Sequence, residues 1–236
     1  MMWMLWACAG TPATIVTMTG VLGDAPKSAG APVAGATVDV LDEAYAPFAT
    51  ATTADDGSFQ VDVPAGYGFY VLASGEGFLS TAFSGRAGIE DFPAADGLPW
   101  IAPEAFADAV RTEFSACTTA AAEGSIVTGE ARQYLGDVAD LNQLPLASSA
   151  TVTVTGSDGT ALQTCYLDDA GVSTADGAVT GTTGRFAVFG APEGPMVVET
   201  RWILDNSDDP ACLFQYAVPA DGVVPMYPAL VPTEGC

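Results

Sequence analysis

The same succession of short segments occurs twice in this chain of 236 residues, and that internal repeat constrains the fold more than any other feature of the sequence. Residues 15–80 and 126–204 each carry the letters IVT near their start and continue as short apolar segments separated by turns that contain Gly. A chain of this length holds one large core or two small ones. We therefore expect two related modules.

Alternation within the segments predicts β-strands. Valines occupy every second position in TVDV (37–40) and in TVTVT (151–155), so one face of each strand is apolar and the other is polar. The turn letters DDG (55–57) and TG (183–184) precede the next strand of each copy. The 26 Gly and 16 Pro of the chain suit many short strands joined by tight turns. The expected fold class is all-β.

Four motifs of the first copy, taken in order, resemble those of a known family. They are PVAGATV (32–38), TADDGSF (53–59), the turn PAG (64–66) and an aromatic-bearing strand that ends in GF (77–78). In this order they resemble the carboxypeptidase regulatory-like domain, a transthyretin-like (prealbumin-like) β-sandwich. The second copy is more divergent, because Ser148 and Ser149 replace the Gly before Ala150, and Thr183 replaces the Asp of the turn.

The resemblance implies two tandem sandwich domains, over residues 14–82 and 124–236, joined by a linker over residues 83–123. Modules of this family are accessory domains that mediate contacts and are not themselves peptidases. The resemblance therefore implies a non-catalytic chain.

The linker is expected to contain one short helix. Phe106, Val110, Phe114 and Cys117 recur at helical spacing, and Pro103 suits the first turn. The apolar stripe that these residues form predicts a helix that packs against a sandwich.

The charged residues exclude several classes of function. The chain has no His, 6 Lys+Arg and 29 Asp+Glu, for a formal net charge of -23. Imidazole is the usual general base and the commonest metal ligand near neutral pH, so serine triads, cysteine–histidine dyads and zinc-peptidase sites are excluded. The acidic surface repels phosphate backbones, which argues against a nucleic-acid partner. We expect no enzyme, no cofactor and no metal.

Residues 1–13 are expected to be a truncated signal segment. Their letters are apolar up to Cys8, and LWAC (5–8) resembles the lipobox of bacterial lipoproteins, in which the Cys becomes the lipidated N-terminus. No Lys or Arg precedes the apolar letters, so a start further upstream is one explanation and an apolar terminus with an incidental Cys is the other. We expect lipid attachment at Cys8, with membrane contact only through this anchor, and a location in the cell envelope or outside the cell.

The remaining cysteines are an even set, Cys117, Cys165, Cys212 and Cys236, which in an exported chain suggests two disulfides. Three pairings are possible. We prefer Cys165 with Cys212, because both lie in the second module, and Cys117 with Cys236, which would tie the helix to the C-terminal residues. A metal site of four thiolates is the alternative, but the chain has no C-x-x-C pair.

Two further groups of residues are candidate binding sites. Acidic clusters at 55–56, 168–169 and 205–209 offer oxygen ligands for calcium, although such loops more often cap their own backbone. Aromatic residues offer a platform for sugar or peptide, unless they fill the core. These aromatic residues are Tyr67, Tyr70, Trp100 and Trp202.

The sequence thus predicts a cell-envelope lipoprotein or secreted protein that acts as a structural or adhesive module. Its partner would be an unknown envelope protein or polysaccharide, bound through loops or strand edges. The alternative is a carbohydrate-binding or carbohydrate-active protein that uses exposed aromatics and carboxylates.

Overall fold

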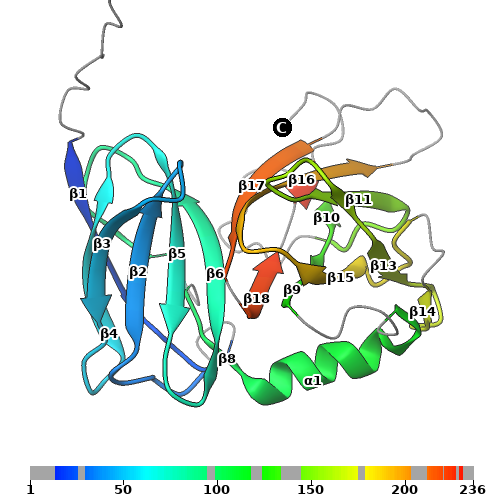
Figure 1. The fold of residues 1–236 in the computed structure, drawn as a ribbon, viewed down its shortest axis with the longest axis horizontal. Coiled ribbons are helices and arrows are strands. Elements are labelled where there is room, and N and C mark those ends of the chain that lie inside the picture. Colours follow the sequence, from blue (N-terminus) through cyan, green and yellow to red (C-terminus); the bar gives the residue numbers. More distant parts are fainter. Residues whose placement is uncertain are drawn as a thin grey trace, which may run out of the picture.

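The computed structural model describes residues 14–25, 30–94, 99–117, 124–133, 145–174, 179–202, 212–219, 221–226 and 229–230. The described part is mostly β-structure arranged as two sandwiches, and it contains one α-helix (Figure 1). The expected fold class is confirmed.

The first sandwich consists of two facing sheets, with strand orders β4-β1-β7 and β3-β2-β5-β6. Its strands are β1 (Ile15–Val21), β2 (Thr37–Asp42), β3 (Pro47–Thr52), β4 (Ser58–Pro64), β5 (Gly68–Ser74), β6 (Phe78–Arg86) and β7 (Phe92–Pro93). The apolar positions of the alternating segments meet between the sheets, where Val38, Val40, Val61 and Val71 are buried. The sandwich continues past residue 82, because β6 ends at Arg86 and β7 pairs with β1.

The second sandwich repeats this order of strands. Its strands are β9 (Ser125–Glu130), β10 (Arg132–Gln133), β11 (Ala150–Thr155), β12 (Ala161–Leu162), β13 (Thr164–Leu167), β14 (Ser173–Thr174), β15 (Arg185–Ala191), β16 (Gly194–Trp202), β17 (Cys212–Val218), β18 (Gly222–Met226) and β19 (Ala229–Leu230). The order β15-β9-β18 matches β4-β1-β7, and β12-β11-β16-β17 matches β3-β2-β5-β6. β13 and β14 extend the edge beyond β15, and β10 pairs with β19. The repeat therefore extends from the sequence motifs to the pairing of the strands.

One strand joins the two sandwiches. β18 lies between β9 of the second sandwich and β6 of the first and runs parallel to both (Figure 1). Gly222 and Val223 lie opposite Ser80 and Thr81 of β6. A single sheet thus runs across the molecule in the order β14-β13-β15-β9-β18-β6-β5-β2-β3.

The shared sheet is covered on different faces in its two halves. In the first half one face packs on β4-β1-β7, and in the second half the opposite face packs on β12-β11-β16-β17. The helix α1 (Glu104–Glu113) follows the short strand β8 (Ala102–Pro103) and covers the other face of the second half (Figure 1). Ala107, Val110 and Phe114 of this region pack against Ile126 and Ala187 of the sheet. The expected helix and its packing against a sandwich are confirmed.

A pair of buried threonines occupies equivalent places in the two sandwiches. The Thr53 hydroxyl accepts a hydrogen bond from the Ala36 N–H at 2.9 Å and donates one to the Val33 carbonyl at 2.7 Å. Thr180 makes the equivalent two bonds in the second sandwich, at 3.0 and 2.8 Å. Each threonine lies four residues before the turn glycine, in the pattern T-x-x-x-G at 53–57 and 180–184. These hydroxyls satisfy buried backbone groups that the strands leave unpaired.

Replacement of Thr180 by Val is expected to lower the free energy of unfolding by about 2 to 4 kcal/mol, because it keeps the shape but leaves a buried N–H and a buried C=O unpaired. Urea denaturation measures this loss. Thr153→Val, on the exposed face of β11, is the control and should change stability by less than about 0.5 kcal/mol. Equal effects of the two substitutions would contradict the assigned hydroxyl bonds.

The divergent Ser149 of the second copy lies in a backbone conformation that favours glycine. Its φ is 61°, and the equivalent Gly35 of the first copy has a φ of 69°. An L-residue in the left-handed region costs about 1 to 2 kcal/mol. Glycine avoids this cost, but the greater flexibility of its unfolded chain removes part of the gain. Ser149→Gly should therefore raise the free energy of unfolding by about 0.5 to 1 kcal/mol, and Gly35→Ser should lower the same free energy. Urea denaturation measures both changes. A destabilised Ser149→Gly variant would show that the serine side chain is needed there.

Candidate functional site

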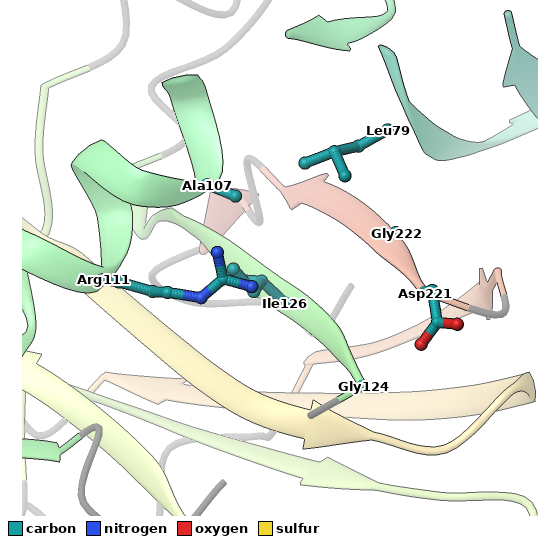
Figure 2. A pocket seen from close by; sticks show the side chains of 7 residues that line it. All are labelled: Leu79, Ala107, Arg111, Gly124, Ile126, Asp221 and Gly222. Carbon is teal, nitrogen blue, oxygen red and sulfur yellow. The ribbon is translucent and has the colours of Figure 1, made fainter. Parts of the chain in front are cut away.

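A cleft of about 400 Å³ opens where α1, β6, β9 and β18 meet. We call it the junction cleft. It is lined by Leu79, Ala107, Arg111, Gly124, Ile126, Asp221 and Gly222. Figure 2 shows the Arg111 side chain reaching from α1 toward Ile126, with Asp221 at the far end of the cleft.

The backbone before β18 produces this cleft. Asp221 has a φ of 49°, and a Cβ on Gly222 would lie 2.2 Å from the carbonyl oxygen of Ser80. The turn is fixed by the Ser125 hydroxyl, which accepts from the Gly222 N–H at 2.8 Å and donates to the Pro219 carbonyl at 2.5 Å. The bare backbone of Gly222 thus lets β18 lie against β6 beneath the start of α1.

The junction cleft combines charged and apolar side chains. Its lining offers one cation and one anion over an apolar floor. Arg111 already forms an exposed ion pair of 3.3 Å with Asp108, which contributes little to stability. Within the described ranges, no group of three or more Cys, Asp or Glu side chains is placed to hold a metal ion.

A network of ion pairs that the sequence motifs did not indicate fastens α1 to the second sandwich. Arg185 of β15 pairs with Glu113 of α1 at 2.5 Å and lies 3.8 Å from Glu130 of β9. Arg132 pairs with the other oxygen of Glu130. The sequence carried one signal for this network. Lys and Arg are rare in the chain, 6 in all, and Arg185 stands directly before the apolar segment that begins at Phe186. The network positions the helix and faces no cleft that we describe.

The structure joins Cys117 to Cys165, with their Cα atoms 6.2 Å apart. The preferred pairing of Cys165 with Cys212 is therefore wrong, as is that of Cys117 with Cys236. Alternate residues of β13 point to opposite faces of the sheet, and Cys165 points to the face that α1 covers. Cys212 lies in β17 of the opposite sheet, and Cys236 lies outside the described residues.

The lipid-attachment residue Cys8 also lies outside the described residues, together with the rest of the segment 1–13. Lipid attachment at Cys8 therefore stays a prediction. In the part of the chain that the structure describes, no helix is both long and apolar enough to cross a bilayer.

Two of the four candidate aromatic residues lie in the core and not on a binding surface. Tyr70 and Trp100 are 3% and 1% exposed, and the Trp100 ring packs edge-on against Phe106 with 5.1 Å between centroids. Tyr67 is 56% exposed, and the side chain of Trp202 is not among those described. The alternative reading, that these aromatic residues fill the core, is therefore confirmed for Tyr70 and Trp100, which offer no surface to a sugar.

The acidic clusters cap turns. Asp56 accepts a hydrogen bond from the Ser58 N–H at 3.0 Å, and hydrogen bonds from Ser58 hold the pKa of the Asp56 carboxyl below its usual value. Asp168 accepts from backbone N–H groups two and four residues on, at 2.9 and 2.8 Å, and Asp169 accepts from another at 2.8 Å. The cluster at 205–209 lies outside the described residues. Asp56, Asp168 and Asp169 therefore stabilise the turns around them through backbone hydrogen bonds.

Comparison with known proteins adds fold similarity only. No family model and no curated protein matches the sequence. Among solved structures, the chain is similar to the TIE protein of Bacillus anthracis, with 12% identity and a TM-score of 0.27 over 93% of this chain and 34% of that chain. It is also similar to the shaft pilin SpaA from Lactobacillus rhamnosus GG, with 12% identity and a TM-score of 0.29 over 94% and 98% of the two chains.

The minor pilin GBS52 of Streptococcus agalactiae is similar at 15% identity and a TM-score of 0.29, over 93% of this chain and 98% of the pilin. This chain spans about a third of the length of the TIE protein, since it covers 34% of it. Identities and TM-scores this low transfer no function. The resemblance to the carboxypeptidase regulatory-like domain accordingly stays a prediction.

Proposed function

We propose that this chain is a non-catalytic binding module of the bacterial cell envelope, which holds the surfaces of two β-sandwiches in fixed relative positions. The observation that carries the proposal is the pairing of β18 with both β9 and β6, which gives the two sandwiches one sheet. A joint made of strand pairing fixes distance and orientation, whereas a flexible linker leaves both free. Such rigidity suits the presentation of loops and edges to an envelope protein or polysaccharide.

Side-chain contacts across the joint support the same rigidity. Leu72 and Ala82 of the first sandwich pack into the second core beside Val224. The Tyr45 hydroxyl donates a hydrogen bond of 2.8 Å to the carbonyl of Val218 at the end of β17. Burial raises the pKa of the Tyr45 phenol above its usual value, so the hydroxyl remains a donor at neutral pH.

Export is part of the proposal. A disulfide persists in oxidising compartments such as the periplasm and the cell surface, and Cys117 and Cys165 form one here. The lipobox-like segment 5–8, which ends in Cys8, would carry the proposed lipid anchor.

Mass spectrometry of the chain expressed from its own gene tests this proposal. We expect the protein in the envelope fraction of a bacterial host, with acyl chains on Cys8 and with non-reduced peptides that link Cys117 to Cys165. A Cys8→Ser control should lose the lipid and keep the disulfide. Recovery of the wild-type chain from the cytosol with free thiols would overturn the proposed location.

The proposed binding to the cell envelope is tested separately from the proposed location. Saturable binding of the purified chain to isolated envelope is expected. Binding no stronger than that of an unrelated acidic protein would contradict it.

A further inference from the structure

A second cleft, of about 290 Å³, lies at one end of the first sandwich, between the β2–β3 turn and the β4–β5 turn. We call it the end cleft. It is lined by Asp42, Glu43, Ala44, Phe48, Pro64, Tyr67 and Gly68. Two aromatic rings and a proline form an apolar wall, and two carboxylates lie at its rim. Ligand pockets usually measure about 300 to 1,000 Å³, so this cleft suits a single side chain.

The backbone holds the carboxylates of the end cleft in place. Glu43 Oε1 accepts a hydrogen bond from the Gly68 N–H at 2.8 Å, and a Cβ on Gly68 would lie 2.8 Å from the same oxygen. Asp42 accepts from the N–H groups of Ala44 and Ala46, both at 2.9 Å. None of the ion pairs among the described side chains includes Asp42 or Glu43. The cleft thus presents pre-positioned negative charge without a described counter-ion.

The walls of the end cleft are both accessible and fixed. The Tyr67 ring is 56% exposed, and Phe48 is half-buried and packs against the first core. The β2–β3 turn that carries Glu43 is anchored to the second sandwich through the bond from Tyr45 to Val218. The joint between the sandwiches therefore also holds one wall of this cleft.

We propose that the end cleft binds the cationic side chain of a Lys or Arg on a basic segment of a partner protein. The alkyl stem lies along Phe48 and Tyr67, and the charged end lies beside Glu43, where ring faces and a carboxylate both attract it. The net charge of -23 steers basic partners toward this chain. The inference rests on the proposed binding function and deepens it, because it names the site and the chemistry of the partner.

Nuclear magnetic resonance titration of the full chain with the peptide Ac-Gly-Lys-Gly-NH₂ tests this site. We expect saturable shifts of the Ala44 and Gly68 amides and of the Tyr67 ring, and none with the norleucine analogue of the peptide. Glu43→Gln keeps an acceptor for the Gly68 N–H and should raise the dissociation constant about tenfold. Tyr67→Ala should raise it about threefold.

Glu76→Gln is the matched control, because Glu76 is exposed in the β5–β6 turn at the opposite end of the sandwich. It removes the same charge and should change the dissociation constant by less than about twofold. Amide spectra outside the cleft should match between variants and so establish that each has folded.

Several results would overturn the site. One is that the norleucine peptide causes shifts equal to those of the lysine peptide. Another is that Glu76→Gln and Glu43→Gln weaken the affinity for the lysine peptide equally. A third is that a trimethylammonium probe binds more tightly than the lysine peptide. Envelope binding that survives when the lysine peptide gives no saturable shift would overturn this site alone. Lysine-peptide binding without envelope binding would instead count against the proposed function.

Discussion

Replacement of Gly222 by Val is expected to lower the free energy of unfolding by at least about 3 kcal/mol, since added bulk in a packed contact is costly. A Cβ at this position would lie 2.2 Å from the Ser80 carbonyl oxygen and 2.4 Å from Cγ of Pro219. Neither group is the end of a flexible side chain, so β18 would have to move away from β6. That movement would expose Val223 and Val224, which are fully buried in the joint.

Urea denaturation of the variant measures this effect. Gly88→Ala is the control, because a Cβ there would have no neighbour within 4 Å. The control should stay within about 0.5 kcal/mol of the parent chain. A Gly222→Val variant as stable as the control would mean that β18 does not lie against β6 as described.

Loss of the disulfide is the other large effect that we expect. Cys117 and Cys165 are 48 residues apart, and the chain-entropy estimate for closing a loop of that length is about 4 kcal/mol. Cys117→Ala should therefore lower the free energy of unfolding by about 2 to 4 kcal/mol, with Cys165 left as a small buried thiol.

A reducing agent provides the control for this prediction. It should destabilise the parent chain and leave the Cys117→Ala variant unchanged if this bond alone is responsible. Non-reducing peptide mapping should also recover Cys117 linked to Cys165. Recovery of Cys165 linked to Cys212 would contradict the observed pairing.

The strands of both sandwiches and their buried faces could be predicted because their signals are local. Alternating valines such as Val38 and Val152 mark the buried faces, and the turn letters before Phe59 and Phe186 mark equivalent strands. The joint could not be predicted in this way, because parallel pairing between β6 and β18 depends on tertiary register.

The structure shows that β18 is the counterpart of β7 of the first sandwich. Pro93 of β7 lies opposite Thr19 of β1, and Pro225 of β18 lies opposite Thr128 of β9. The two prolines occupy equivalent places, so β18 is a longer version of the edge strand β7. Only the longer strand reaches the neighbouring sandwich.

The burial of Tyr70 and the pairing of Cys117 with Cys165 share a physical reason, because both depend on packing between elements that are distant in the sequence. β5 is buried on both faces, so Phe69 and Tyr70 both lie in the interior although they point to opposite faces of the sheet. A single sandwich, in which each sheet has one solvent-exposed face, does not predict that both faces of β5 are buried. Likewise, an even number of cysteines suggests only that disulfides form, whereas the position of α1 over β13 decides that Cys117 meets Cys165.

The rigid joint between the sandwiches is tested most directly by ¹⁵N relaxation of the backbone amides of the full chain. Strand pairing through β18 predicts that both sandwiches fit one rotational diffusion tensor, with the overall correlation time expected for a 23.9 kDa particle. Separate tensors, with a shorter correlation time for each half, would contradict the shared sheet and the function that we propose from it.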